Sequence, residues 1–158
     1  MQAGFKTVNS PDQTDGYAPT LLLGLSRGGI IAADIISRLA EDTPLGVLDA
    51  KRRVKGGEVF FEEKPLQALL EAHCRSTKHQ ARILLVDDVF KTGASLLSAM
   101  RVVERLMSIL DPGVAGDFMI RTLVLIYQGE PHKDRYVPDY YIEKVEESAS
   151  VMLPYGRG

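Results

Sequence analysis

The residues best suited to chemistry lie in the stretch VDDVFKTGAS, residues 86–95. Asp87 and Asp88 follow an apolar run, where adjacent carboxylates lose hydration and repel each other, so they need hydroxyl donors or a cation nearby. Thr92, Gly93 and the small residues after them offer hydroxyls and backbone N–H groups where a helix should begin, which suits a phosphate. A sugar with vicinal hydroxyls at one end and a phosphate at the other would span both features.

A second motif, GLSRGG, occupies residues 24–29 directly after another apolar run. The guanidinium of Arg27 can donate paired hydrogen bonds to phosphate oxygens, and the flanking glycines let backbone N–H groups approach an anion. In open α/β sheets, ligands bind beyond the carboxyl ends of the strands. Because both motifs follow apolar runs, we expect them at the same edge of one sheet.

The stretch ILLVDDVFKTGASL resembles the phosphoribosyl pyrophosphate signature of type I phosphoribosyltransferases: a hydrophobic strand, two acidic residues, a short spacer and a Thr-Gly loop. GLSRGG is similar to the pyrophosphate-binding loop in the purine (xanthine, hypoxanthine, guanine) branch of that family. The resemblance extends from Leu21 to about Ile109 and is looser in the tail. It implies an enzyme of purine salvage that uses phosphoribosyl pyrophosphate and magnesium to attach 5-phosphoribose to a nitrogenous, purine-like base, with release of pyrophosphate.

The resemblance also implies roles for individual residues. Asp87 and Asp88 would face the ribose hydroxyls and, with Arg27, are the catalytic candidates. Magnesium would arrive with the substrate, so no metal site built from protein ligands is expected. The substrate-binding candidates are Ser26, Arg27 and Gly28 for the pyrophosphate, Lys91, Thr92, Gly93, Ala94 and Ser95 for the 5-phosphate, Asp87 and Asp88 for the ribose, and Lys51 and Arg52, with Arg53 and Lys55, for a loop that closes over the site.

One backbone feature follows from the same resemblance. The family often holds a non-proline cis peptide in the pyrophosphate loop, which makes the bond between Ser26 and Arg27 the candidate.

The apolar pattern predicts the elements that position these residues. Buried strands are expected at 20–25, 44–49, 82–86 and 118–127, and helices at 30–39, from Pro65 onward and at 96–110. Short extended segments are expected at 138–143 and 151–155. This alternation predicts an α/β fold with a doubly wound, mostly parallel sheet flanked by helices and a small irregular hood from the C-terminal segment. Residues 1–19 are expected to form an N-terminal arm, and residues 20–158 one phosphoribosyltransferase-like domain.

Composition narrows the classes of partner. A net charge of -2 and a pI near 5.9 give no broad basic field, which argues against nucleic acids and anionic membranes as partners. Cys74 is the single cysteine, so an internal disulfide is excluded and a packed thiol is expected. No apolar run approaches the ~20 residues that cross a bilayer. We expect a cytoplasmic protein, and the resemblance adds a homodimer.

Three departures from the family pattern keep a second interpretation open. Lys91 stands where 6-oxopurine enzymes commonly carry an aspartate, and the stretch LIYQG at 125–129 lacks their base-contacting lysine. Their base-stacking aromatic corresponds to SASV at 148–151, although Tyr155 offers a ring. The alternative is a regulatory protein that binds phosphoribosyl pyrophosphate or a nucleotide without turnover. A phosphoacceptor signalling domain, suggested by ILLVDD, fits poorly because about eighty residues precede that strand.

Each candidate residue also has a purely structural interpretation. Asp87 and Asp88 could form a strand-end turn, and Arg27, Lys91 and the basic run at 51–55 could be solvated. The tyrosines at 127, 140, 141 and 155 are more often packing residues than base stackers. The histidines at 73, 79 and 132 lack partners at catalytic or metal-binding spacing and are expected at the surface.

Overall fold

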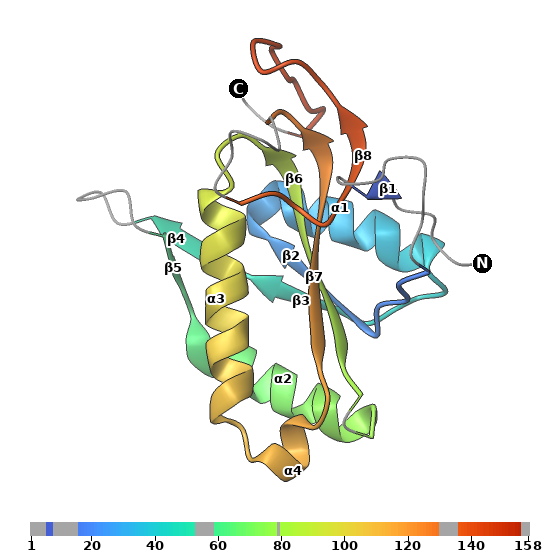
Figure 1. Ribbon diagram of the computed structural model, residues 1–158, viewed down its shortest axis with the longest axis vertical. Coiled ribbons are helices and arrows are strands. Elements are labelled where there is room, and N and C mark those ends of the chain that lie inside the picture. Colours follow the sequence, from blue (N-terminus) through green and yellow to red (C-terminus); the bar gives the residue numbers. More distant parts are fainter. Residues whose placement is uncertain (1–5, 8–15, 53–58, 79, 130–135, 156–158) are drawn as a thin grey trace.

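A six-stranded sheet forms the centre of the computed structural model, which describes residues 6–7, 16–52, 59–78, 80–129 and 136–155 (Figure 1). Its strand order is β1-β8-β7-β6-β2-β3, and every neighbouring pair is parallel except β1 with β8. The predicted α/β fold with a mostly parallel sheet is confirmed. The strands of this sheet are β1 (Lys6–Thr7), β2 (Leu21–Leu25), β3 (Leu45–Leu48), β6 (Arg82–Phe90), β7 (Met119–Tyr127) and β8 (Tyr140–Lys144).

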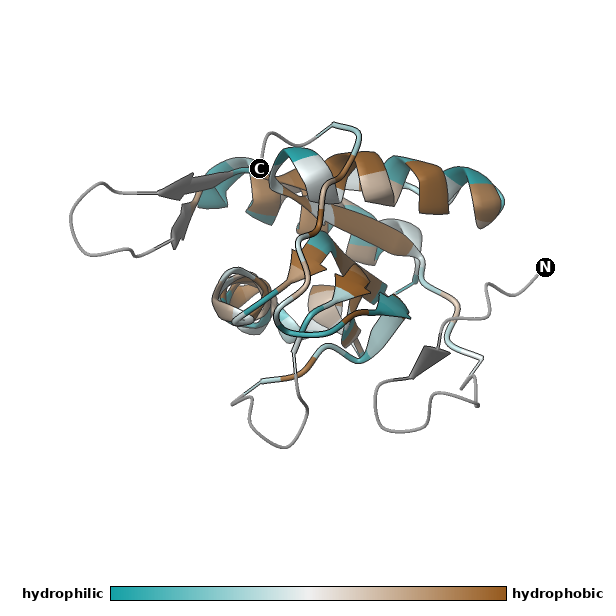
Figure 2. Cartoon of the chain, turned by 90° about the horizontal axis from the view of Figure 1, so that it is seen from above, coloured by the Kyte–Doolittle hydropathy of each residue, from teal (hydrophilic) through white to brown (hydrophobic). Residues whose placement is uncertain are grey.

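Helices cover both faces of the sheet. One face packs on α1 (Ser26–Leu39), and the other on α2 (Glu63–Ser76), α3 (Ala94–Ile109) and the short α4 (Pro112–Ala115). Figure 2 looks down on the edge where the parallel strands end and shows the largely brown strands between α1 and α3. Since successive side chains of a strand point to opposite faces, the apolar runs of the sequence serve two helical layers at once.

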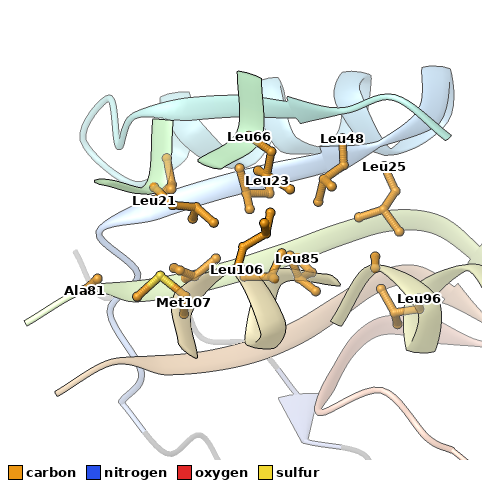
Figure 3. Close-up of a cluster of buried hydrophobic side chains, with 14 of the residues drawn as sticks. Leu21, Leu23, Leu25, Leu48, Leu66, Ala81, Leu85, Leu96, Leu106 and Met107 are labelled. Carbon is orange, nitrogen blue, oxygen red and sulfur yellow. The ribbon is translucent and has the colours of Figure 1, made fainter. Parts of the chain in front are cut away.

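The alternation is visible in β2 and β6, which are buried along most of their length. Leu22 and Leu84 belong to the cluster under α1, whereas Leu23 and Leu85 belong to the larger cluster under α2 and α3. Figure 3 shows the larger cluster, in which β2 leucines face Leu106 and other apolar side chains of the helices. This double burial fixes the register of the central strands and hence the position of the residues that follow them.

Several element boundaries differ from the sequence prediction. α1 begins at Ser26 rather than at residue 30, so it starts immediately after β2 without a loop. β6 continues to Phe90, four residues beyond the predicted end, because pairing with β7 extends to Tyr127. Residues 151–155 form no strand and end in a turn.

The stretch that precedes β2 contributes to the core. Tyr17, in the stretch expected to be an arm, is buried, and its hydroxyl donates hydrogen bonds to the backbone oxygens of Ile83 (3.0 Å) and Met119 (3.3 Å). The ring of Tyr17 belongs to the cluster under α1 and stacks on the ring of Tyr140. A two-stranded hairpin of β4 (Ala50–Arg52) and β5 (Val59–Phe61) extends from the body beside α3 (Figure 1).

The buried face of α2 includes Cys74 and His73, for both of which the sequence made a prediction. Cys74 is fully buried and near Met107, so the expected packed thiol is confirmed. The expectation of a surface His73 is wrong: its ring is buried and pairs with Thr20, Nε2 lying 2.8 Å from Oγ1. His79 and His132 lie outside the described residues. Within the described ranges, none of the helices has the length and apolar character needed to cross a membrane.

Candidate functional site

The end of β6 presents two carboxylates to different parts of the molecule. Up to Val86, β6 pairs with both β2 and β7; beyond it only the pairing with β7 continues. Asp87 lines a cleft at the start of α3, whereas Asp88 lies against the start of α1. This follows from the alternation of side chains along a strand. The acid pair therefore stands between the N-termini of two helices.

The contact between Asp88 and α1 depends on Gly28. A Cβ atom added to Gly28 would lie only 1.7 Å from Oδ2 of Asp88. Any side chain at position 28 would thus displace either the carboxylate or the helix. The two motifs, about sixty residues apart in the sequence, meet here as expected.

GLSRGG forms the junction between β2 and α1 rather than an open loop. Ser26, the first residue of α1, has a φ of 54°, so a left-handed residue turns the chain directly from strand to helix. No cis peptide bond joins any of the described residues, and the proposed cis bond between Ser26 and Arg27 is wrong. The turn is instead made by rotation at Ser26. The side chains of Ser26 and Arg27 are exposed at the first turn of α1.

The Thr-Gly segment forms the other wall of the site. Gly93 is the N-cap of α3 with a φ of 74°, and an added Cβ would lie 2.6 Å from Cε2 of Phe90. Glycine is needed there for both the backbone conformation and the space. Gly93 supplies no capping side chain, and the N–H of Ala94 makes a long contact of 3.5 Å to Oγ1 of Thr92. The other N–H groups at the start of a helix lack intrahelical acceptors and can serve an external one.

A cleft of about 180 Å³ opens at this helix start. Lys91, Thr92 and Ala94 are exposed, and Ser95 is half-buried. Residues that carry backbone N–H groups, hydroxyls and one ammonium group therefore line a small space beside Asp87, which suits a phosphate group. The cleft is lined by Asp87, Val89, Phe90, Lys91, Thr92, Gly93, Ala94, Ser95, Leu96 and Val124.

Burial dominates the electrostatics of the acid pair. It raises the pKa of Asp87 to about 7, with a smaller contribution from the neighbouring charge of Asp88. The backbone N–H of Asp88 donates to Oδ1 of Asp87 at 2.9 Å, which partly offsets the increase. Asp87 is thus poised to gain or lose a proton near neutral pH, a property common at functional sites.

The C-terminal segment is fastened next to the site by Gln128, which directly follows β7. Its buried side-chain Nε2 donates to the backbone oxygens of Glu146 (3.3 Å), Glu147 (2.9 Å) and Ala149. Farther along this segment, burial and then the charges of Asp88 and Asp87 raise the pKa of Tyr155. Its buried hydroxyl finds no hydrogen-bond partner among the described residues. The segment thus brings an aromatic residue into the electrostatic range of the acid pair.

Other candidates divide into two groups. Tyr127, Tyr140 and Tyr141 are buried, so their expected role in packing is confirmed. Lys51 and Arg52 lie in β4, whose backbone pairs with β5, whereas Arg53 and Lys55 lie outside the described residues.

Sequence reasoning missed two residues around the site. Gln128 has the same signal as the acid pair, a polar residue directly after an apolar strand, and this signal could have identified it. Tyr136 packs beside Gly93, an added Cβ of which would lie 3.4 Å from Cδ1 of the tyrosine. No local sequence pattern predicts that contact, because more than forty residues separate Gly93 from Tyr136.

Comparison with known proteins gives the family and the fold. The family model described as "Phosphoribosyl transferase domain" matches residues 6–155. An adenine phosphoribosyltransferase of Bordetella pertussis is 31% identical over 90 residues, which cover 54% of this chain and 48% of that protein. The chain spans about half the length of the curated relatives it matches.

Solved structures show the same fold. A purine phosphoribosyltransferase from Pyrococcus horikoshii superposes with a TM-score of 0.62 and 25% identity, covering 90% of this chain and 80% of that one. A xanthine-guanine-hypoxanthine phosphoribosyltransferase from Helicobacter pylori, at 17% identity and a TM-score of 0.52, shares the fold over 80% of this chain and 69% of its own.

Proposed function

Because the chain belongs to the phosphoribosyl transferase domain family, we propose that it transfers the 5-phosphoribosyl group of phosphoribosyl pyrophosphate to a purine-like base and releases pyrophosphate. One observation carries the proposal. The carboxylates of Asp87 and Asp88 stand between two helix starts, one beside the cleft at α3 and the other against Gly28 of α1. A ribose held by the acid pair would have a phosphate seat on one side and a pyrophosphate seat on the other.

Each part of the site has a chemical task in this proposal. Asp87 and Asp88 accept hydrogen bonds from the ribose hydroxyls, and residues 91–95 bind the 5-phosphate at the start of α3. Ser26, Arg27 and Gly28 meet the pyrophosphate at the start of α1. Lys51 and Arg52 belong to the hairpin of β4 and β5, which would close over the pyrophosphate.

Catalysis follows from that placement. As pyrophosphate leaves the anomeric carbon, positive charge develops on the sugar ring, as in glycoside chemistry. The carboxylates of the acid pair stabilise this charge, while Arg27 balances charge on the leaving group. The remaining contribution is orientation of the two reactants and exclusion of water.

Magnesium fits this site as a companion of the substrate. Among the described residues, no group of three or more His, Cys, Asp or Glu side chains could by itself hold a metal ion. Mg²⁺ usually keeps several waters and binds through one or two carboxylates plus substrate phosphates, so the ion would arrive with the substrate. Asp87, which lines the cleft, and Asp88, which lies against Gly28, would be at most partial ligands. When bound, the ion would supply charge neutralisation to the pyrophosphate.

Several broader features belong to the same proposal. The base is purine-like because the relatives are named for adenine and other purines. Residues 20–158 form one phosphoribosyltransferase-like domain in this proposal, to which the preceding stretch adds β1 and Tyr17. The enzyme works as a cytoplasmic homodimer, the common arrangement of the family.

A panel assay tests the proposal. The protein is incubated with magnesium, phosphoribosyl pyrophosphate and individual bases, and pyrophosphate is measured. Release with one purine is expected. Thermal stabilisation by phosphoribosyl pyrophosphate without release for any base would favour the regulatory alternative and contradict catalysis.

Two substitutions test the site itself. Asp88→Asn and Thr92→Ala are each expected to weaken phosphoribosyl pyrophosphate binding at least tenfold, as measured by calorimetry, with little change in melting temperature. Thr43→Ala serves as control, because Thr43 lies in the turn after α1, where its hydroxyl donates to the backbone oxygen of Ala40 and its backbone oxygen accepts from the hydroxyl of Ser37. Parent-like affinity in both site variants would refute the assignment.

A further inference from the structure

Gly93, the N-cap of α3, is enclosed by two aromatic rings from different parts of the chain. An added Cβ would lie 2.6 Å from Cε2 of Phe90, at the end of β6, and 3.4 Å from Cδ1 of Tyr136. The Phe90 ring is itself held edge-on by Tyr127, with ring centroids 5.1 Å apart. Aromatic side chains therefore pack against the backbone of Gly93 at the phosphate cleft.

The Tyr136 ring is fixed by its hydroxyl. That hydroxyl donates to Oγ1 of Thr122 at 2.8 Å, and Thr122 is completely buried in β7. Oγ1 of Thr122 in turn donates to Oδ2 of Asp139 at 3.0 Å and accepts from the backbone N–H of Asp139 at 3.0 Å. The Tyr136 ring thus has little freedom to rotate away from Gly93.

The carboxylate of Asp139 also joins this network to the backbone and side chains of β7. Oδ2 of Asp139 also accepts from the backbone N–H of Thr122 at 2.8 Å, and Oδ1 pairs with Arg121 at 3.1 Å. Burial raises the pKa of Tyr136 to about 12, so the phenol keeps its proton, and its donor role, at neutral pH. A charge-assisted network of this kind rigidifies the groups it joins.

We propose that Tyr136 is a positioning residue for the phosphate seat: its ring, anchored through Thr122 and Asp139, holds Gly93 in the left-handed conformation that aims the first N–H groups of α3 into the cleft. This role rests on the proposed function in one respect, namely that the cleft binds the 5-phosphate. The anchoring of the loop stands independently of it. The residue itself touches no substrate in this account.

Three variants separate positioning from general destabilisation. Tyr136→Leu removes the ring and the hydroxyl, Tyr136→Phe keeps the ring, and Ile36→Ala truncates a buried residue of α1 on the opposite face of the sheet. Binding of ribose 5-phosphate is measured by calorimetry. Hydrogen exchange of the amides of residues 92–97 is measured in the unliganded proteins, relative to the amides of β2.

Tyr136→Leu is expected to weaken ribose 5-phosphate binding about tenfold and to speed exchange at residues 92–97 more than at β2. Its KM for phosphoribosyl pyrophosphate should rise while its KM for the base stays within about twofold of the parent. Tyr136→Phe is expected to remain within about threefold of the parent. Ile36→Ala is expected to leave affinity unchanged and to speed exchange no more at residues 92–97 than at β2, against which Ile36 packs.

The outcomes are distinguishable. Parent-like affinity and exchange in Tyr136→Leu, or equal losses in Ile36→Ala, would overturn the positioning role. Failure of the parent to bind ribose 5-phosphate would refute the proposed function, and the exchange comparison would still decide whether Tyr136 anchors the loop.

Discussion

Oδ2 of Asp88 occupies the space that any side chain on Gly28 would need, since an added Cβ would lie 1.7 Å away. The carboxylate at the end of β6 and the first turn of α1 are therefore in direct contact. The favourable interaction of a negative charge with a helix N-terminus adds to that packing. Because Gly28 has no Cβ atom, the start of α1 can approach Asp88 this closely.

Gly28→Ala is expected to reduce turnover at least a hundredfold and to destabilise the fold by roughly 1–3 kcal/mol, the usual cost of overpacking. The added methyl must push Asp88 out of place or shift the start of α1. Steady-state kinetics and urea unfolding measure the two effects. Gly113→Ala is the control, because its Cβ would meet only the side chain of Asp111, at 3.0 Å. Parent-like turnover in Gly28→Ala would show that Asp88 need not stay where it is.

The contact between Gly28 and Asp88 also shows what the sequence could and could not predict. Strand-then-helix periodicity placed both motifs at the carboxyl edge of the sheet, because double burial leaves a strong continuous apolar signal in β2 and β6. The opposite orientation of Asp87 and Asp88 was not predicted. It depends on β6 continuing past Val86, which pairing with β7 decides and local composition does not.

The other errors also have identifiable physical causes. The start of α1 was placed too late because Ser26, Arg27 and two glycines carry no apolar periodicity, although the helix includes them. His73 was misplaced because its partner, Thr20, is more than fifty residues away in the sequence. The contact of Tyr136 with Gly93 is long-range in the same sense. Such pairings arise from tertiary packing, which no short window of sequence contains.

The raised pKa of Asp87 makes the stability of the unliganded protein depend on pH. Because the folded-state pKa is about 7 and the ordinary value is 3.8, the stabilisation is fully present below pH 4 and is lost as pH rises through 7. At ~1.4 kcal/mol per pKa unit, this group should lower the free energy of unfolding by about 2–3 kcal/mol between pH 5 and 8. Chemical unfolding of the parent and of Asp87→Asn checks this, and equal pH slopes in the two proteins would contradict it.

The same carboxyl group should couple ligand binding to proton release. Hydroxyl donors of a bound ribose favour the ionised form of Asp87 and so lower its pKa from about 7. Calorimetric titration with ribose 5-phosphate at pH 6.5, in two buffers of different ionisation enthalpy, should report net release of protons. Asp87→Asn corrects for protons released by the phosphate itself. A parent that releases no more protons than this variant would argue against contact between Asp87 and the sugar.

Gln128→Met should loosen the C-terminal segment. The substitution conserves volume but removes the donor that serves the backbone oxygens of Glu146, Glu147 and Ala149, at a cost of about 1–3 kcal/mol. Because this segment carries Tyr155, the KM for the base is expected to rise about tenfold and to rise more than the KM for phosphoribosyl pyrophosphate. Gln80→Met, at an exposed position, is the control. Unchanged exchange of amides 145–155 in Gln128→Met would show that the segment is held by other contacts.

Mildly acidic conditions should destabilise the fold through the buried ring of His73. Burial lowers the pKa of His73 from 6.5, so the folded protein keeps the ring neutral beside Thr20. The resulting stability is present above pH 6.5 and is lost as pH falls, because the unfolded chain then binds a proton that the folded chain resists. The effect of Asp87 has the opposite sign, so the two must be separated by variants. Between pH 7.5 and 5, the parent is expected to lose more stability than His73→Gln, which keeps a polar partner for Thr20 but cannot titrate. Denaturant unfolding at both pH values measures the difference, and identical losses would place His73 in contact with solvent.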